Sequence, residues 1–190
     1  MATAKHSFIY LEEIPLNKTM KTIQGHSERH QMTLAFLKKH MPTQSKILDL
    51  GTPTDLSKLI NDYGFVLQNT NGENLDTDYQ AYLDTGVDVV TAFEIFEHML
   101  APFNILKDLK TDKLIASVPL NLWFSSAYWG ADEWDKHYHE FEKKQFDFLL
   151  KQTGWKIKDS EMWASYKNEI GIRPLLRRFY PRYYIVYCER

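Results

Sequence analysis

The chain has 190 residues, of which 44% are hydrophobic and 25% are charged, a composition typical of one globular domain. Its net charge of −2 gives no overall electrostatic reason to bind nucleic acid, and no apolar run approaches the roughly 20 residues that span a membrane. Cys188 is the only cysteine, which excludes an internal disulfide, and residues 1–13 lack the features of a secretory signal. We therefore expect a cytoplasmic protein with neither nucleic-acid nor membrane partners.

Hydrophobic periodicity divides most of the chain into alternating strands and helices. Glycine and proline mark several of the boundaries between these elements. The predicted elements, in chain order, are an arm at 1–25, a helix at 27–40, a strand at 47–50, a helix capped at 54–55 and ended at Gly64, strands at 65–68 and 87–93, a helix at 95–109 interrupted at Pro102, a strand at 113–118, a helix at 143–152, and strands at 155–163 and 183–188.

This alternation predicts an α/β fold with a doubly wound, mostly parallel sheet and helices on both faces. The last two strands can pair as an antiparallel excursion, so we expect the final strand to run antiparallel. No repeat or linker divides the chain. Residues 1–190 are predicted to form a single domain, with an arm and helix over 1–42 and the α/β core over 46–190.

The segment 71–87 is too short for a regular repeat of this architecture. A complete βαβ unit takes about 30 residues or more. We therefore predict that the unit around 72–87 is reduced, with its helix and edge strand lost or shortened to a turn.

The stretch 46–55 reads as a buried strand, a sharp turn and a helix start, a junction at which α/β proteins commonly bind nucleotide-type ligands. Gly51 tolerates a positive φ and places no side chain in the way of a ligand. Pro53 cannot reach a positive φ and has no N–H, so the turn follows a path of its own. Thr52 and Thr54 either offer hydroxyls to a ligand or belong to a rigid turn and helix cap.

Three pieces of sequence, in this order, resemble the class I S-adenosylmethionine-dependent methyltransferases over about residues 46–163. They are ILDLG at 47–51, then VDVVTAFEIFEH at 87–98, and LIASVP at 114–119 followed by HYHEF at 137–141 and LLKQTGW at 149–155. The second piece resembles the family's fourth strand and a Glu-x-x-Glu-His helix start. The resemblance implies a Rossmann-like fold, S-adenosylmethionine as cofactor and a small-molecule methyl acceptor.

The same resemblance implies where the cofactor lies. In the family an acidic residue ends the second strand and accepts both ribose hydroxyls; Asn71 falls at that place here and lacks the charge. Asp76 or Asp78 either substitutes for that residue or caps a turn. The predicted cofactor-binding residues are Asp49, Gly51, Thr52, Thr54, Asn71, Phe93 and Glu94.

The acceptor side is predicted to carry the catalytic residues Glu97, His98 and His137. His98 is a candidate general base, because an ordinary imidazole pKa suits neutral pH. In some relatives a Glu-x-x-Glu-His set with a distant histidine instead holds a divalent cation, which His137 or His139 would complete here. A third interpretation makes these side chains caps and supporting hydrogen-bond partners, with Glu94 the strongest case. Our assignment of site residues includes no metal.

Two further clusters stand out in the sequence. The aromatic stretch at 123–129 either walls an apolar pocket or pins a loop to the core or to another subunit. The arginines between 173 and 190 alternate with tyrosines, yet the pattern at 184–188 fits a core strand better than a nucleic-acid surface.

The function that these observations favour is methyl transfer from S-adenosylmethionine to a small molecule, with a hydroxyl as one option for the acceptor. The alternative is a methyltransferase-like binding or scaffold protein that no longer uses the cofactor, since fold does not fix function. A nicotinamide-dependent oxidoreductase is disfavoured, because no Gly-x-Gly-x-x-Gly follows the first strand.

Overall fold

The computed structural model describes residues 28–83, 86–164, 176 and 179–190. The predicted arm at 1–25 and most of the segment that joins the last two strands lie outside these residues. The elements, in chain order, are α2 (Glu28–His40), β1 (Lys46–Asp49), α3 (Asp55–Tyr63), β2 (Val66–Asn69), the 3-10 turn η1 (Tyr79–Tyr82), β3 (Val89–Phe93), the 3-10 turn η2 (Phe96–His98), α4 (Pro102–Asp108), β4 (Lys113–Pro119), the 3-10 turn η3 (Glu133–Asp135), α5 (Lys143–Gln152), β5 (Lys156–Trp163) and β6 (Tyr183–Glu189).

The six strands form one sheet in the order β2-β1-β3-β4-β6-β5. The first four strands of that order are parallel, whereas β6 runs antiparallel to both β4 and β5. The predicted mostly parallel sheet with an antiparallel last strand is therefore confirmed. Adjacent strands β1 and β3 lead into connections on opposite sides of the sheet, so their carboxyl ends meet at a topological switch point.

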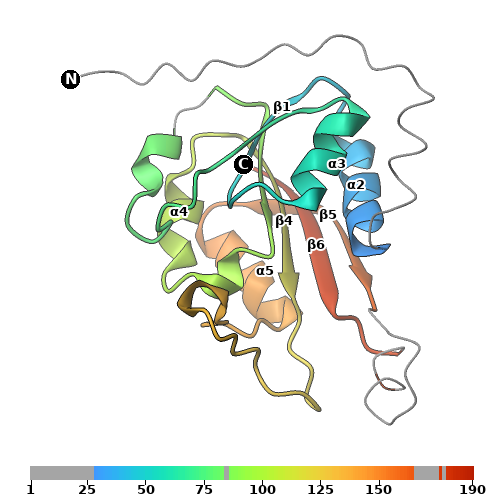
Figure 1. Ribbon diagram of the computed structural model, residues 1–190, viewed down its shortest axis with the longest axis vertical. Coiled ribbons are helices and arrows are strands. Elements are labelled where there is room, and N and C mark those ends of the chain that lie inside the picture. Colours follow the sequence, from blue (N-terminus) through green and yellow to red (C-terminus); the bar gives the residue numbers. More distant parts are fainter. Residues whose placement is uncertain (1–27, 84–85, 165–175, 177–178) are drawn as a thin grey trace.

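Helices cover both faces of the sheet, as predicted (Figure 1). Helices α2 and α3 pack one face, where Phe36 and Ile60 lie against strand residues such as Ile47. Helices α4 and α5 pack the other face, where Ile105 and Phe146 are fully buried. Strand β6 serves both cores because its successive side chains alternate between the two clusters.

The segment between β2 and β3 is reduced, as predicted. Its described residues contain the single turn η1 and no strand. Asp76 accepts hydrogen bonds from the backbone N–H groups of Leu100 and Ala101, at 2.9 and 2.7 Å, just before α4 begins at Pro102. Asp76 therefore acts as a cap, as one of its two predicted roles proposed. Its hydrogen bonds connect the short segment to the start of α4.

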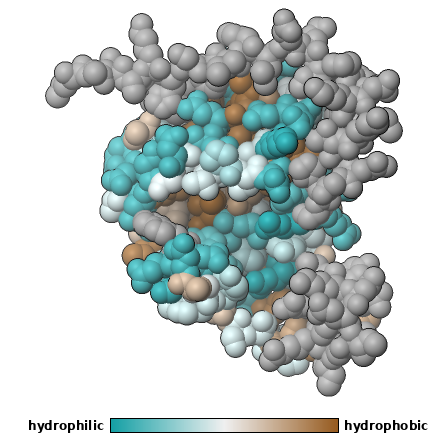
Figure 2. All heavy atoms as spheres, in the orientation of Figure 1, coloured by the Kyte–Doolittle hydropathy of each residue, from teal (hydrophilic) through white to brown (hydrophobic). Residues whose placement is uncertain are grey.

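Hydrophilic residues cover most of the described surface in the view of Figure 2, with hydrophobic residues showing between them. No helix in the described part of the chain combines the length and apolar character needed to cross a membrane. Several large apolar side chains are nevertheless exposed, including Trp123 at 73% and Trp129 at 65%. Both belong to the aromatic stretch that follows β4.

Candidate functional site

A cavity of about 380 Å³ opens at the carboxyl ends of β1 and β3, the topological switch point of the sheet. Its walls come from α2, the turn after β1, the start of α3, the turn after β3, strand β4 and the last residue of η3. Seven of the ten residues predicted for the site line it: Asp49, Gly51, Thr52, Thr54, Phe93, Glu94 and His98.

The turn after β1 is fixed by a hydrogen-bond network around Gly51. Gly51 has a φ of +123°, donates its N–H to the Thr70 hydroxyl at 2.8 Å and accepts from the Asn69 side chain at 3.1 Å. A β-carbon at this position would lie 2.8 Å from Cδ1 of Ile95. Both the backbone conformation and the close approach of Ile95 therefore require glycine here.

Asp49 is a buried carboxyl at the end of β1. It accepts from the Thr91 hydroxyl at 2.6 Å and from the Asn69 amide at 3.0 Å. Burial raises the pKa of Asp49 to about 7, and these two hydrogen bonds oppose the shift. Since both oxygens already have partners, Asp49 orients the turn as well as lining the cavity.

Thr54 is the N-cap of α3. Its side chain accepts from the backbone N–H of Ser57 at 3.3 Å, and the Ser57 hydroxyl accepts from the Thr54 backbone N–H at 3.2 Å, a reciprocal capping box. Thr54 therefore caps α3, as one of the two predicted alternatives proposed. It also lines the cavity, where a cofactor contact stays a prediction.

Asn71 lies apart from this cavity. It lines a more open depression on the outer side of α3 and β2 instead. Its backbone N–H donates to the Glu73 carboxylate at 2.7 Å, and the Tyr82 hydroxyl donates to the same carboxylate. Glu73 is the acidic residue nearest to Asn71 in the sequence, and it lies four residues beyond the last residue of β2.

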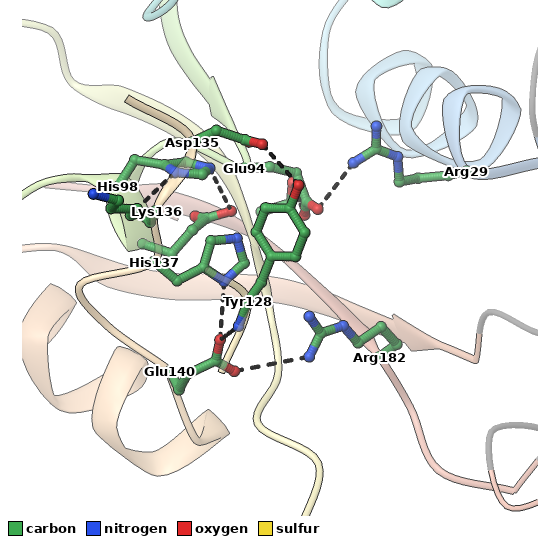
Figure 3. A network of polar contacts seen from close by, with 11 residues as sticks. Arg29, Glu94, His98, Tyr128, Asp135, Lys136, His137, Glu140 and Arg182 are labelled. Atoms are coloured by element: carbon green, nitrogen blue, oxygen red, sulfur yellow. Dashed lines mark hydrogen bonds and ion pairs between the residues drawn. The ribbon is translucent and has the colours of Figure 1, made fainter. Parts of the chain in front are cut away.

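Glu94 sits at the turn after β3 with a φ of 60°, which is unusual for a residue with a side chain. Its carboxylate accepts from Arg29 at 2.9 Å (Figure 3). It also accepts from the Ser117 hydroxyl at 3.3 Å. Burial raises the pKa of Glu94, and the positive charges of Arg29 and Arg182 oppose that shift. Three further residues line the cavity that the sequence did not predict: Arg29, Ser117 and Asp135. The hydrophobic periodicity of a helix or strand does not show which of its side chains reach a distant turn.

The structure brings the three predicted catalytic residues close together, although they come from two separate segments: Glu97, His98 and His137. The rings of His98 and His137 stand edge to face with centroids 4.8 Å apart, and His98 Nε2 lies 3.8 Å from a carboxylate oxygen of Glu97. Glu97 is only 1% exposed and its second oxygen has no hydrogen-bond partner. Burial, and then the neighbouring Glu94, raises the pKa of Glu97 well above its ordinary value.

Backbone contacts hold the loop at 137–141 against η2. The carbonyl oxygen of Glu97 accepts from the N–H groups of Tyr138 and His139, at 2.8 and 3.1 Å. His98 Nδ1 lies 3.1 Å from the carbonyl oxygen of Lys136, and a carbonyl can only accept, so Nδ1 carries the proton and Nε2 is left with a lone pair. Burial and His137 lower the pKa of His98, which favours this neutral ring.

The aromatic stretch after β4 reaches the site through one residue. The Tyr128 hydroxyl donates to Asp135 at 2.7 Å, and the Tyr128 ring lies 5.2 Å from that of His137. Trp123 and Phe124 instead cluster with Tyr180 away from the cavity walls. The stretch therefore does not wall this cavity as a unit.

Comparison with known proteins rests on structure alone. No protein-family model and no curated protein matches the sequence. Among solved structures, an S-adenosylmethionine-dependent methyltransferase from Mesorhizobium loti matches with a TM-score of 0.51 and 13% identity, covering 82% of this chain and 96% of its own.

Two structures with bound ligands match as well. The 1,6-didemethyltoxoflavin-N1-methyltransferase of Burkholderia thailandensis, bound to 1,6-didemethyltoxoflavin and S-adenosylhomocysteine, has a TM-score of 0.58 at 16% identity and covers 90% of this chain and 82% of its own. The magnesium protoporphyrin IX methyltransferase of Synechocystis PCC 6803, bound to S-adenosylmethionine, has a TM-score of 0.52 at 16% identity over 94% and 86%. The chain therefore has the fold of the class I S-adenosylmethionine-dependent methyltransferases.

Proposed function

We propose that the protein transfers a methyl group from S-adenosylmethionine to a small-molecule acceptor. The observation that carries this proposal is the cavity at the switch point of the sheet, whose floor is the Gly51 turn and whose far wall is Glu94. In a methyltransferase-type fold this edge of the sheet is where a ligand binds. The toxoflavin and porphyrin methyltransferases that share the fold support a small-molecule acceptor.

The residues around the cavity fit the amino-acid end of such a cofactor. An amino acid presents one positive and one negative group, and Glu94 and Arg29 offer opposite charges on one wall of the cavity. Gly51 keeps the turn free of side-chain atoms, while Asp49 and Thr52 line the same end. Phe93 adds an apolar contact. Thr54 and Asn71 remain predicted contacts, with Thr54 nearer to the cavity.

The acceptor side is assigned to Glu97, His98 and His137. S-adenosylmethionine supplies an activated methyl group, so the chain has mainly to hold an acceptor atom in line with it, about 3 Å away. His98 is the member of this group that lines the cavity, and its unprotonated Nε2 can serve an acceptor hydroxyl either as a base or as the ligand of a metal ion. These two uses exclude each other.

Titration calorimetry with S-adenosylmethionine and S-adenosylhomocysteine tests the proposal. We expect both to bind the folded protein, and a Gly51→Ala variant to bind at least about tenfold more weakly because its new methyl group occupies the turn. Gly64→Ala is the matched control, since Gly64 also has a positive φ but lies outside the cavity. Absence of heat at millimolar ligand would favour the alternative, a binding or scaffold protein that no longer uses the cofactor.

A further inference from the structure

We propose that Glu97, His98 and His137 bind one divalent transition-metal ion. Each residue offers one ligand atom, and the three atoms lie within 4.8 Å of one another. Bonds from such an ion to imidazole nitrogen and carboxylate oxygen are about 2.0–2.2 Å long, so two ligand atoms of one ion lie at most about 4.4 Å apart. The three donors therefore have to close in only slightly to share a single ion.

The hydrogen bonds of the two histidines leave the correct nitrogen free. His98 directs Nδ1 to the carbonyl oxygen of Lys136, and His137 directs Nδ1 to the Glu140 carboxylate at 3.0 Å (Figure 3). This leaves Nε2 of each ring as the nitrogen that can bind an ion. Metal-binding histidines commonly use a carbonyl or carboxylate in this way to fix the tautomer and the orientation of the ring.

An unpartnered carboxylate oxygen is the second, independent sign of a ligand. Oε2 of Glu97 is fully buried and accepts no hydrogen bond, in a side chain that is 1% exposed. An ionised carboxylate costs several kcal/mol when it is buried without a partner, and a cation beside it offsets that cost. The two arginines whose charges act on Glu97, Arg182 and Arg29, already pair with Glu140 and Glu94.

Two residues that the sequence motif offered as ligands, Glu94 and His139, do not belong to the proposed ligand set. Glu94 bonds to Arg29 and Ser117, so it is not available to the ion. His139 stacks on Phe141 at 5.4 Å and does not belong to the group of three donors. Three protein ligands leave coordination positions open, which is the arrangement of catalytic rather than structural sites. His98 lines the cavity, so we place an open position there, within reach of an oxygen atom of the acceptor.

Two imidazoles and one carboxylate favour zinc, cobalt or manganese over magnesium, which prefers oxygen ligands. With His98 Nε2 bound to the ion, His98 holds the metal and is not the general base. The inference does not require that S-adenosylmethionine binds, so it stands or falls separately from the proposed function.

The experiment uses untagged full-length protein that has been stripped with a chelator. Zn²⁺, Co²⁺, Mn²⁺ and Mg²⁺ are titrated by calorimetry, and Co²⁺ is also followed by its visible absorption spectrum. We expect one site per chain, with affinity rising from Mn²⁺ to Co²⁺ to Zn²⁺ and Mg²⁺ the weakest. Zn²⁺ should also raise the melting temperature of the wild-type protein.

Variants then identify the ligands. His98→Gln, His137→Gln and Glu97→Gln should each weaken Zn²⁺ binding by more than the roughly 10- to 100-fold that loss of an outer partner costs. His139→Gln, a neighbouring imidazole outside the donor set, and Glu94→Gln should change it by less than about tenfold. Circular dichroism confirms that each variant is folded.

Three results would overturn the proposal. One is the absence of Zn²⁺ and Co²⁺ binding by folded wild-type protein at micromolar to millimolar metal. Another is binding that survives both His98→Gln and His137→Gln, because the ion would then lie elsewhere. The third is a loss in Glu94→Gln as large as that in His137→Gln, which would make Glu94 a ligand.

Discussion

The α-carbon of Gly51 faces the side chain of Ile95 so closely that a β-carbon on it would lie 2.8 Å from Cδ1 of that residue. This contact joins the turn after β1 to the turn after β3. Two neighbouring strands thus share one packed junction at the floor of the cavity, and the position of each turn depends on the other.

Gly51→Ala should destabilise the fold more than Gly64→Ala. Both replace a glycine at positive φ, which costs about 1–2 kcal/mol. Only Gly51→Ala also collides with Ile95, which adds about 1–3 kcal/mol of overpacking. Urea unfolding measures both losses. Ile95→Val removes the colliding methyl group, so it should recover part of the loss in the double variant; no recovery would mean that strain alone is responsible.

Thr54→Ala should lower the free energy of unfolding by about 1 kcal/mol, because it removes the side-chain acceptor at the start of α3. Thr54→Ser, which keeps the hydroxyl, should restore most of the stability. Calorimetry with S-adenosylhomocysteine on the same two variants shows whether Thr54 only caps the helix or also contacts the cofactor. A cap alone leaves the affinity of Thr54→Ala near that of wild type, whereas a fall of tenfold or more would establish Thr54 as a cofactor contact.

The buried carboxyl of Asp49 should make stability fall between about pH 4 and pH 7. Its folded-state pKa is about 7, above the ordinary value of 3.8, so the folded protein holds a proton in this window that the unfolded chain has released. A shift of this size corresponds to about 4 kcal/mol, lost as pH rises to about 7 and constant above it.

Asp49→Asn removes the titrating group and should flatten that part of the pH profile. Denaturant unfolding from pH 4 to pH 8 compares the two proteins. Asp88→Asn, at an exposed carboxyl that bonds the backbone of Lys46, is the control and should retain the wild-type slope. A profile that is unchanged in Asp49→Asn would mean that another group carries the pH dependence.

Arg29 and Glu94 should show a modest coupling in a double-mutant cycle of Arg29→Gln and Glu94→Gln. Their side chains are 38% and 19% exposed, so solvent screens the pair and a coupling of about 1 kcal/mol is expected. Salt should reduce it. If the pair also holds the amino-acid end of the cofactor, each single variant weakens S-adenosylhomocysteine binding by more than it weakens folding. Small and equal losses of binding and folding free energy would mean that Arg29 and Glu94 only stabilise the fold.

Local patterns predicted the elements well because their signals are local. Helix α5 has the predicted bounds, since a capping box at Glu142 and Gln145 begins it and Gly154 follows its end. Thr54 and Gly64 bound α3 for the same kind of reason. The mostly parallel sheet followed from the alternation of strands and helices, and the short segment at 72–87 was recognised from its length alone.

Contacts between distant segments were harder to predict. Strand β6 lies between β4 and β5 in the sheet. This order depends on pairing between segments far apart in the sequence, and the hydrophobic periodicity of each strand gives no information about it. Arg29 reaches Glu94 because α2 packs beside the sheet edge, and the helical pattern gives no sign of that. The meeting of Glu97, His98 and His137 was anticipated only because a motif linked them; their spacing alone would not place His137 there.

The carbonyl oxygen of Glu97 anchors the loop that carries His137 by main-chain bonds to Tyr138 and His139. Main-chain bonds do not depend on which side chains the loop presents. Tyr138 is exposed, so replacing its side chain leaves these main-chain bonds in place. The main chain of this loop therefore fixes the distance between His98 and His137, while the exposed side chains of the loop can vary in sequence.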